Sequence, residues 1–151
     1  MTAKEYLKQV ERMDKQIENL KDRMEEIWTS LTSITVDPSK EVVDGTKTPG
    51  MSDGLIEELN KLSKELGRRR LELIIKRGQI ELQIQSLSKP IYIEILSRRW
   101  LDHIKLDQQI EMEGLAHGKD YSYICDLHRK ALNEFGQKFS EEIAKSNSNP
   151  M

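Results

Sequence analysis

This 151-residue chain has one cysteine, four prolines and eight glycines, so few of its residues can form a disulfide bond or break a helix. The single cysteine, Cys125, has no partner for an internal disulfide, which excludes a small domain held together by disulfides. No run of about 18 apolar residues occurs, and the N-terminal stretch has no apolar core, so we expect neither a transmembrane helix nor a secretory signal. The 24 Lys and Arg residues nearly balance the 26 Asp and Glu residues, so bulk charge favours neither nucleic acid nor an anionic membrane. These absences predict a reduced, cytoplasmic protein with no membrane partner.

Motifs of catalysis and metal binding are also missing. His103, His117 and His128 are not at metal-ligand spacing, and Cys125 with His128 alone does not complete a zinc site. Neither a glycine-rich phosphate loop nor a nucleophile elbow is present. The many carboxylates lie among Lys and Arg, as on a solvated helix surface. We therefore expect no enzyme activity, no metal site and no cofactor.

What the chain does contain is a helical pattern at its N-terminal end. Apolar residues recur from Ala3 to Ile34 in alternating steps of three and four, which predicts a long helix with a narrow apolar seam. Thr2 and Glu5 have the spacing of a capping box at its start. A helix of this kind is not stable alone and must lay its seam on a partner. The seam positions of this helix are Val10, Ile17, Leu20 and Ile27.

A second long helix is expected after a flexible linker. Residues 35–54 hold two prolines and three glycines, and they predict the linker. The helix then runs from Leu55 to Leu87, and its seam is interrupted at Arg69 and Lys76. The simplest fold packs the two helices antiparallel, as a coiled-coil-like hairpin over residues 1–87. The same seam also permits a homodimer through the hairpin. The seam positions of the second helix are Leu59, Leu62 and Leu66.

Residues 88–145 predict a small domain of three helices. Pro90 suits the first turn of a helix that extends to about His103, and a short helix follows near Leu106. A turn over residues 114–120 leads to a last helix, capped by Asp120 or Ser122. The polar residues 146–151 predict a disordered tail. The expected fold class is all-α: the long hairpin, followed by a helix-turn-helix-like unit. The inward face of the last helix consists of Ile124, Leu127, Ala131, Leu132 and Phe135.

The opposite face of this last helix carries side chains that can bind DNA. Arg and Asn side chains read base edges in the major groove, whereas Lys, Ser and Tyr hold phosphates. Residues 88–151 nevertheless contain nine basic and ten acidic residues, whereas DNA-binding domains usually show a basic face. The candidates on the base side are Ser122, Tyr123, Asp126 and Arg129, and those on the phosphate side are Arg98, Arg99, Lys105, Lys119 and Lys130.

The segment YSYICDLHRKALNEF, residues 121–135, resembles the recognition helix of sigma-factor region 4 and its phage relatives. Its pattern Tyr-Ser-Tyr followed by Leu-His-x-x-Ala-Leu-x-x-Phe is similar to small phage proteins of Gram-positive bacteria, including the ArpU- and RinA-type late-gene regulators. The opening MTAKEYLKQVERMDKQIENL also resembles that group, so the likeness covers about two thirds of the chain. It implies a helix-turn-helix protein that binds double-stranded DNA, RNA polymerase or both, in the host bacterial cytoplasm.

Two functions are consistent with these residues. The resemblance implies a phage-type transcription regulator that uses the last domain on DNA or polymerase. The charge balance fits a helical protein–protein interaction module with no DNA binding. The turn over residues 111–120 is longer and more acidic than in the regulators it resembles, as expected of a relative that kept the fold but binds protein instead of DNA. Operator sequence, direction of regulation and stoichiometry do not follow from the residues.

Overall fold

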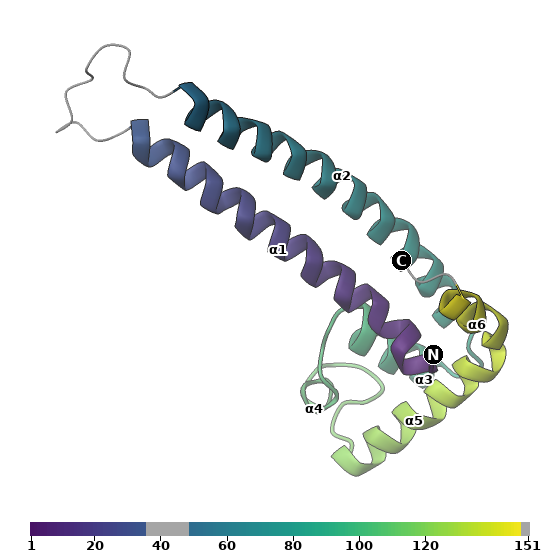
Figure 1. The fold of residues 1–151 in the computed structure, drawn as a ribbon. Helices are drawn as coiled ribbons and strands as arrows, with labels where there is room; N and C mark the ends of the chain where they lie inside the picture. The colour runs from purple at the N-terminus through teal and green to yellow at the C-terminus, as the bar shows by residue number, and fades with distance from the viewer. Residues whose placement is uncertain (36–48, 149–151) are drawn as a thin grey trace. The chain divides into compact units, whose positions relative to one another are not determined.

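The protein is all-α, as predicted. The computed structural model describes residues 1–35 and 49–148, and within these ranges every regular element is a helix (Figure 1). The elements are α1 (Ala3–Thr35), α2 (Pro49–Gln85), α3 (Pro90–Leu96), the π-helical turn η1 (Ser97–Leu101), α4 (Leu106–Gln109), α5 (Tyr121–Lys138) and α6 (Ser140–Ser148).

The chain divides into two compact units, and the division differs from the expected boundary between residues 87 and 88. One unit, here the hairpin unit, is Asp14–Glu72. The other, here the terminal unit, combines Met1–Met13 with Leu73–Met151. Both long helices contribute to both units, so the domain expected over residues 88–145 shares its core with the two chain segments 1–13 and 73–87.

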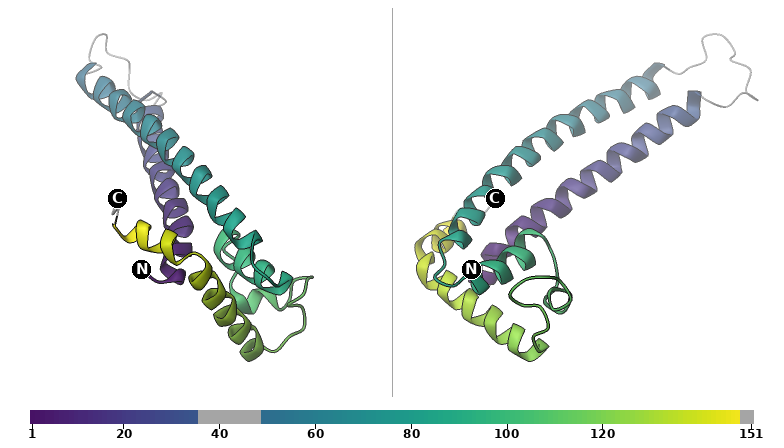
Figure 2. Two further views of the ribbon diagram at one scale, coloured as in Figure 1. Left: turned by 90° about the vertical axis from the view of Figure 1, so that its right-hand side faces the viewer. Right: turned by 180° about the vertical axis from the view of Figure 1, so that it is seen from behind.

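The hairpin unit contains the later part of α1, from Asp14, and the earlier part of α2, to Glu72, which run antiparallel and side by side (Figure 2). Arg23 pairs with Glu58, and Arg69 on α2 donates a hydrogen bond to the Gln16 side chain on α1. Arg23 follows Gln16 in α1, whereas its partner Glu58 precedes Arg69 in α2. The two helices therefore run in opposite directions. Of the predicted seam in this unit, Ile17, Ile27 and Leu66 are buried, and Leu20, Leu59 and Leu62 are half-buried.

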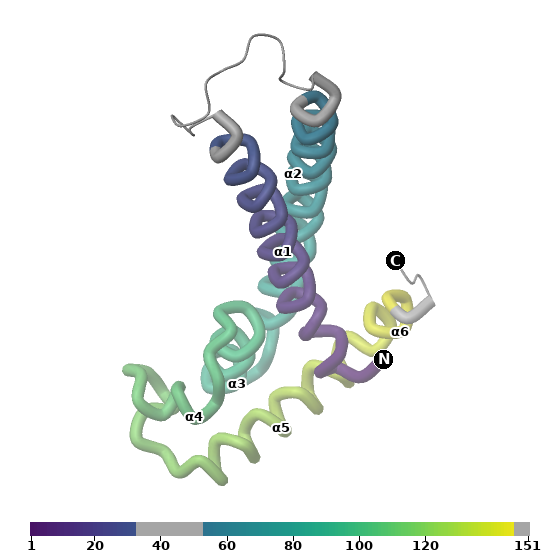
Figure 3. Tube along the Cα trace, turned by 60° about the vertical axis from the view of Figure 1, so that its left-hand side comes forward, coloured from purple at the N-terminus to yellow at the C-terminus, as the bar shows by residue number. Residues whose placement is uncertain are grey.

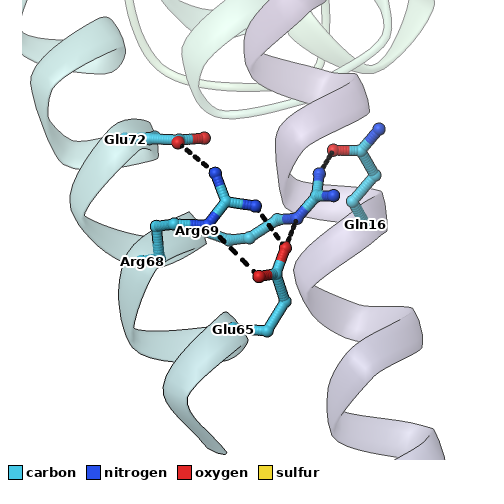
Figure 4. A network of polar contacts seen from close by, with 5 residues as sticks. All are labelled: Gln16, Glu65, Arg68, Arg69 and Glu72. Carbon is cyan, nitrogen blue, oxygen red and sulfur yellow. Dashed lines mark hydrogen bonds and ion pairs between the residues drawn. The ribbon is translucent and has the colours of Figure 1, made fainter. Parts of the chain in front are cut away.

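A polar network explains why the seam of α2 tolerates Arg69 (Figure 4). The Glu65 carboxylate accepts hydrogen bonds from Arg68 and from Arg69, whose Nε lies 2.9 Å away. Arg68 also donates to Glu72 at 2.7 Å, and Arg69 reaches across to Gln16. Arg69 therefore lies half-buried at an apolar position of the pattern, with its guanidinium hydrogen-bonded to Glu65 and Gln16.

The terminal unit has the main apolar core of the described residues. Tyr6 from α1 packs against Phe135 of α5 with ring centroids 5.9 Å apart, and its hydroxyl donates to the Gln83 side chain at 3.0 Å. Lys76, the second interruption of the seam, holds its ammonium 5.3 Å from the centre of the Tyr6 ring, and burial lowers its pKa. Fully buried members of this core also include Leu7, Val10, Ile80, Ile84, Ile95, Leu96 and Ala131.

Helix ends agree with the predicted caps in part. Thr2 Oγ1 accepts from the Glu5 amide and the Glu5 carboxylate accepts from the Thr2 amide, so the capping box is confirmed. The linker boundaries were wrong: α1 includes Thr35, and α2 begins at Pro49, where a proline suits the first helical turn. The rest of the expected linker, residues 36–48, lies outside the described residues.

The C-terminal prediction was also wrong in part. The backbone turns at Phe139 (φ −116°, ψ 29°), and a separate helix α6 then runs to Ser148, into the expected disordered tail. Its Ile143 is buried against the core, which anchors a helix that the polar composition alone does not predict. Residues 149–151 lie outside the described residues.

Candidate nucleic-acid interface

Helix α5 separates cleanly into a buried face and an exposed face. Ile124, Leu127, Ala131 and Phe135 are buried, as predicted, and Leu132 is half-buried. The helix packs along α3, and its beginning meets α4 (Figure 3). Asp120 takes the N-cap position with an extended backbone, again as predicted, although its side chain makes no capping hydrogen bond. The order of α3, α4, turn and α5 is compatible with a helix-turn-helix.

Two polar contacts attach the later part of α5 to the turn before α3. The Glu134 carboxylate accepts hydrogen bonds from the Ser88 amide, at 3.0 Å, and from the Ser88 hydroxyl, and these bonds lower its pKa. The Lys138 ammonium donates to the Ser86 carbonyl at 2.6 Å. These contacts, together with the apolar face, fix the axial rotation of α5 and hence which residues it exposes.

The long turn before α5 is held by one carboxylate from α3. Glu94 accepts hydrogen bonds from the backbone amides of Leu115 and Ala116, both at 3.1 Å. Arg98 lies 3.5 Å from Glu94 and donates to the carbonyl of Glu113 at 2.6 Å. Sequence reasoning missed Glu94 as a positioning residue, although its i,i+4 spacing to Arg98 was a visible signal.

Gly114 lets the turn approach this ion pair. Its φ of +143° is a conformation that residues with a Cβ rarely adopt, and a Cβ there would lie only 2.3 Å from Glu94 Oε1. The Gly118 amide then closes the turn on the Ile110 carbonyl at 3.0 Å. The acidic turn predicted to differ from that of the regulators is thus an ordered structure with its own internal bonds.

Two of the predicted phosphate contacts are engaged inside the protein. Arg98 holds the turn, and only 20% of its side chain is exposed. Arg99 lies over the Trp100 ring, 4.2 Å from its centre, and 3.9 Å from Glu11 of α1. The structure thus shows both arginines bonded within the terminal unit. Lys105, Lys119 and Lys130 of the same predicted set are exposed.

Three of the four predicted base-side residues are exposed on α5, and the fourth, Asp126, is acidic and half-buried. Ser122 and Tyr123 are exposed near the helix start, and the Arg129 side chain is 71% exposed. Asp126 pairs with Arg129 and, at 3.2 Å, with Lys130. The hydrogen bond from Lys130 lowers the pKa of Asp126, and Arg129 lowers it further. The Lys119 ammonium lies 5.8 Å from the centre of the Tyr123 ring.

Behind this face, a buried indole meets a histidine. Trp100 is 1% exposed, and its Nε1–H donates to His128 Nε2 at 3.1 Å. Burial, helped by the positive charges of Arg99 and Lys4, lowers the pKa of His128 to about 4. His128 is therefore neutral at physiological pH and provides a hydrogen-bond acceptor on α5 for the buried Trp100.

Other kinds of site find little support in the described residues. Among them, no group of three or more His, Cys, Asp or Glu side chains is placed to bind a metal ion. None of the described helices combines the length and apolar character needed to cross a bilayer. No protein-family model, curated protein or solved structure matches the chain.

Proposed function

We propose that the protein is a phage-type transcription regulator that binds double-stranded DNA through the exposed face of α5. The observation that supports this most is the division of α5 into two faces: Ile124, Leu127, Ala131 and Phe135 are buried. Ser122, Tyr123 and Arg129 are exposed. The family resemblance of residues 121–135 adds RNA polymerase as a second partner and the host bacterial cytoplasm as the compartment.

Each exposed residue has a distinct role in this proposal. Arg129 is the base-reading residue, because its planar guanidinium can make two hydrogen bonds to a guanine. When the protein binds DNA, the Arg129 guanidinium leaves the Asp126 carboxylate and forms its hydrogen bonds with the base instead. Lys105, Lys119 and Lys130 contact phosphates, which orient the helix without reading sequence. Arg98 and Arg99 act indirectly, by holding the turn and the core that position α5.

The test is a gel-shift titration of DNA that flanks the protein's own gene, at two salt concentrations. Affinity should fall steeply with salt, because phosphate contacts release counterions. Arg129→Ala should cost about 1–3 kcal/mol of specific binding and relax discrimination at one base pair. Lys119→Ala should weaken binding to all sequences and reduce the salt slope by about one. The matched control is Lys61→Ala, an exposed lysine of the hairpin unit, which should leave affinity unchanged.

A protein-binding module without DNA binding is the second candidate. It is favoured by the pairing of Asp126 with both Arg129 and Lys130, and by the engagement of Arg98 and Arg99 with carboxylates. If the wild-type protein binds no duplex in a salt-dependent way, the DNA proposal fails and this second function replaces it.

A further inference from the structure

The hairpin unit has an open apolar groove along one side. Met24 and Trp28 of α1 and Leu59 of α2 form its apolar surface, and Glu25, Asn60 and Ser63 complete its lining. Trp28, which follows the seam residue Ile27, is 59% exposed, a large apolar surface to leave in water. The groove is open to solvent, so it fits the side of another helix better than an enclosed small molecule.

Two helices alone do not cover the apolar surface of this unit. Leu20, Leu59 and Leu62 of the predicted seam remain half-buried, and Ile56 and Leu71 of α2 are 47% and 60% exposed. A helical pair of this kind becomes a stable core when further helices pack against it. An additional helical partner is therefore needed to exclude water from the groove.

The charges of the hairpin unit identify that partner. At the end formed by residues 22–28 and 53–60, six acidic side chains accompany one basic side chain. At the other end, formed by residues 14–21 and 61–72, seven basic side chains accompany four acidic ones. The unit thus carries opposite charge at its two ends. A second copy placed antiparallel brings each acidic end against a basic end, whereas a parallel copy brings like charges together.

We propose that two copies of the chain associate through this groove, antiparallel, as a four-helix bundle about a twofold axis. The face offered by two helices of about 20 residues measures roughly 30 by 20 Å, on the order of 600 Å² per copy. The total of about 1,200 Å² lies at the lower end of specific protein interfaces, so the dimer dissociates on dilution. Trp28 of each copy is buried on association.

The experiment is sedimentation of the full-length chain over a range of concentrations. The wild-type protein should change from monomer to dimer as concentration rises, and Trp28→Ala should weaken the dimer at least tenfold. Because Trp28 is mostly exposed in one copy, this variant should keep its helical circular dichroism. Leu82→Ala is the control, since Leu82 is 75% exposed but lies in the terminal unit, and it should leave the dimer unchanged.

Charge reversal tests the antiparallel arrangement. Glu57 and Arg70 are exposed and lie at the acidic and basic ends. Glu57→Lys and Arg70→Glu should each weaken the dimer, and the double variant should recover most of the wild-type affinity. Strengthening by Glu57→Lys would indicate a parallel pair and overturn the proposal. The proposal would also be overturned if the chain stays monomeric at every concentration, or if Trp28→Ala leaves the dimer dissociation constant unchanged. The proposal does not rest on DNA binding, and Arg129→Ala should dimerise like the wild type.

Discussion

Replacing Glu94 by Gln isolates the contribution of one carboxylate to the position of α5. Both oxygens of Glu94 accept a backbone amide of the turn, from Leu115 and from Ala116, and the carboxylate also lies beside Arg98. The side chain is only 17% exposed, and Ala116 is fully buried. Glutamine has nearly the same shape but one acceptor oxygen. Its NH2 group would face a backbone N–H that also needs an acceptor.

The expected cost follows from these contacts. A hydrogen bond to a charged group contributes about 1.5–3 kcal/mol, and a buried donor left without an acceptor costs about 1–3 kcal/mol. The variant keeps one of the two bonds in weaker, neutral form. We therefore expect the turn of Glu94→Gln to be less stable by about 2–3 kcal/mol, while the buried face of α5 keeps the rest of the terminal unit folded.

Amide hydrogen exchange measures this directly, since protection reports the free energy of local opening. Every 1.4 kcal/mol is tenfold, so a loss of about 2–3 kcal/mol lowers protection at Leu115 and Ala116 by roughly 30- to 150-fold. Glu113→Gln is the matched control, because the structure uses only the backbone carbonyl of Glu113. Unchanged exchange at Leu115 and Ala116 in a folded Glu94→Gln variant would refute the account of the turn.

Two further predictions concern stability. Acidification from pH 6.5 towards about 4 should destabilise the protein, because His128 stays neutral when folded, with a pKa lowered to about 4 mainly by burial, while it becomes protonated in the unfolded chain. His128→Gln should flatten this dependence in urea unfolding, and an equally steep curve would contradict the prediction. Ile17→Asp places a charge at a position that is 6% exposed, which should cost several kcal/mol and lower the melting temperature followed by circular dichroism. A wild-type melting curve would mean that the seam is not buried.

Local patterns in the sequence predicted most of the helical organisation. The capping box of Thr2 and Glu5 depends on residues three apart, so its spacing alone predicts the start of α1. The buried face of α5 follows in the same way from the repeat of Ile124, Leu127 and Ala131. Helical periodicity specifies which residues share a face, and the exposed candidates of α5 were the complement of that face.

Contacts between distant residues could not be predicted in this way. Arg98 and Arg99 look like free cations in the sequence, but their partners lie in the turn at Glu113 and in α1 at Glu11. Lys76 interrupts the apolar pattern, yet it lies over the ring of Tyr6, seventy residues earlier. Such positions become intelligible only once the packing of α1, α2 and α3 is known.

The core of the terminal unit has a consequence for synthesis on the ribosome. Tyr6 and Leu7 are translated well before Phe135, which contacts the Tyr6 ring. At about 5–20 residues per second, the two aromatic side chains are made roughly 6–26 s apart. Throughout this interval the side of the Tyr6 ring that contacts Phe135 has no partner on α5, although Ile80 and Ile84 of the same core are already made. A translation product that stops before α5 would leave that side uncovered, and it would then present a binding segment for chaperones and proteases.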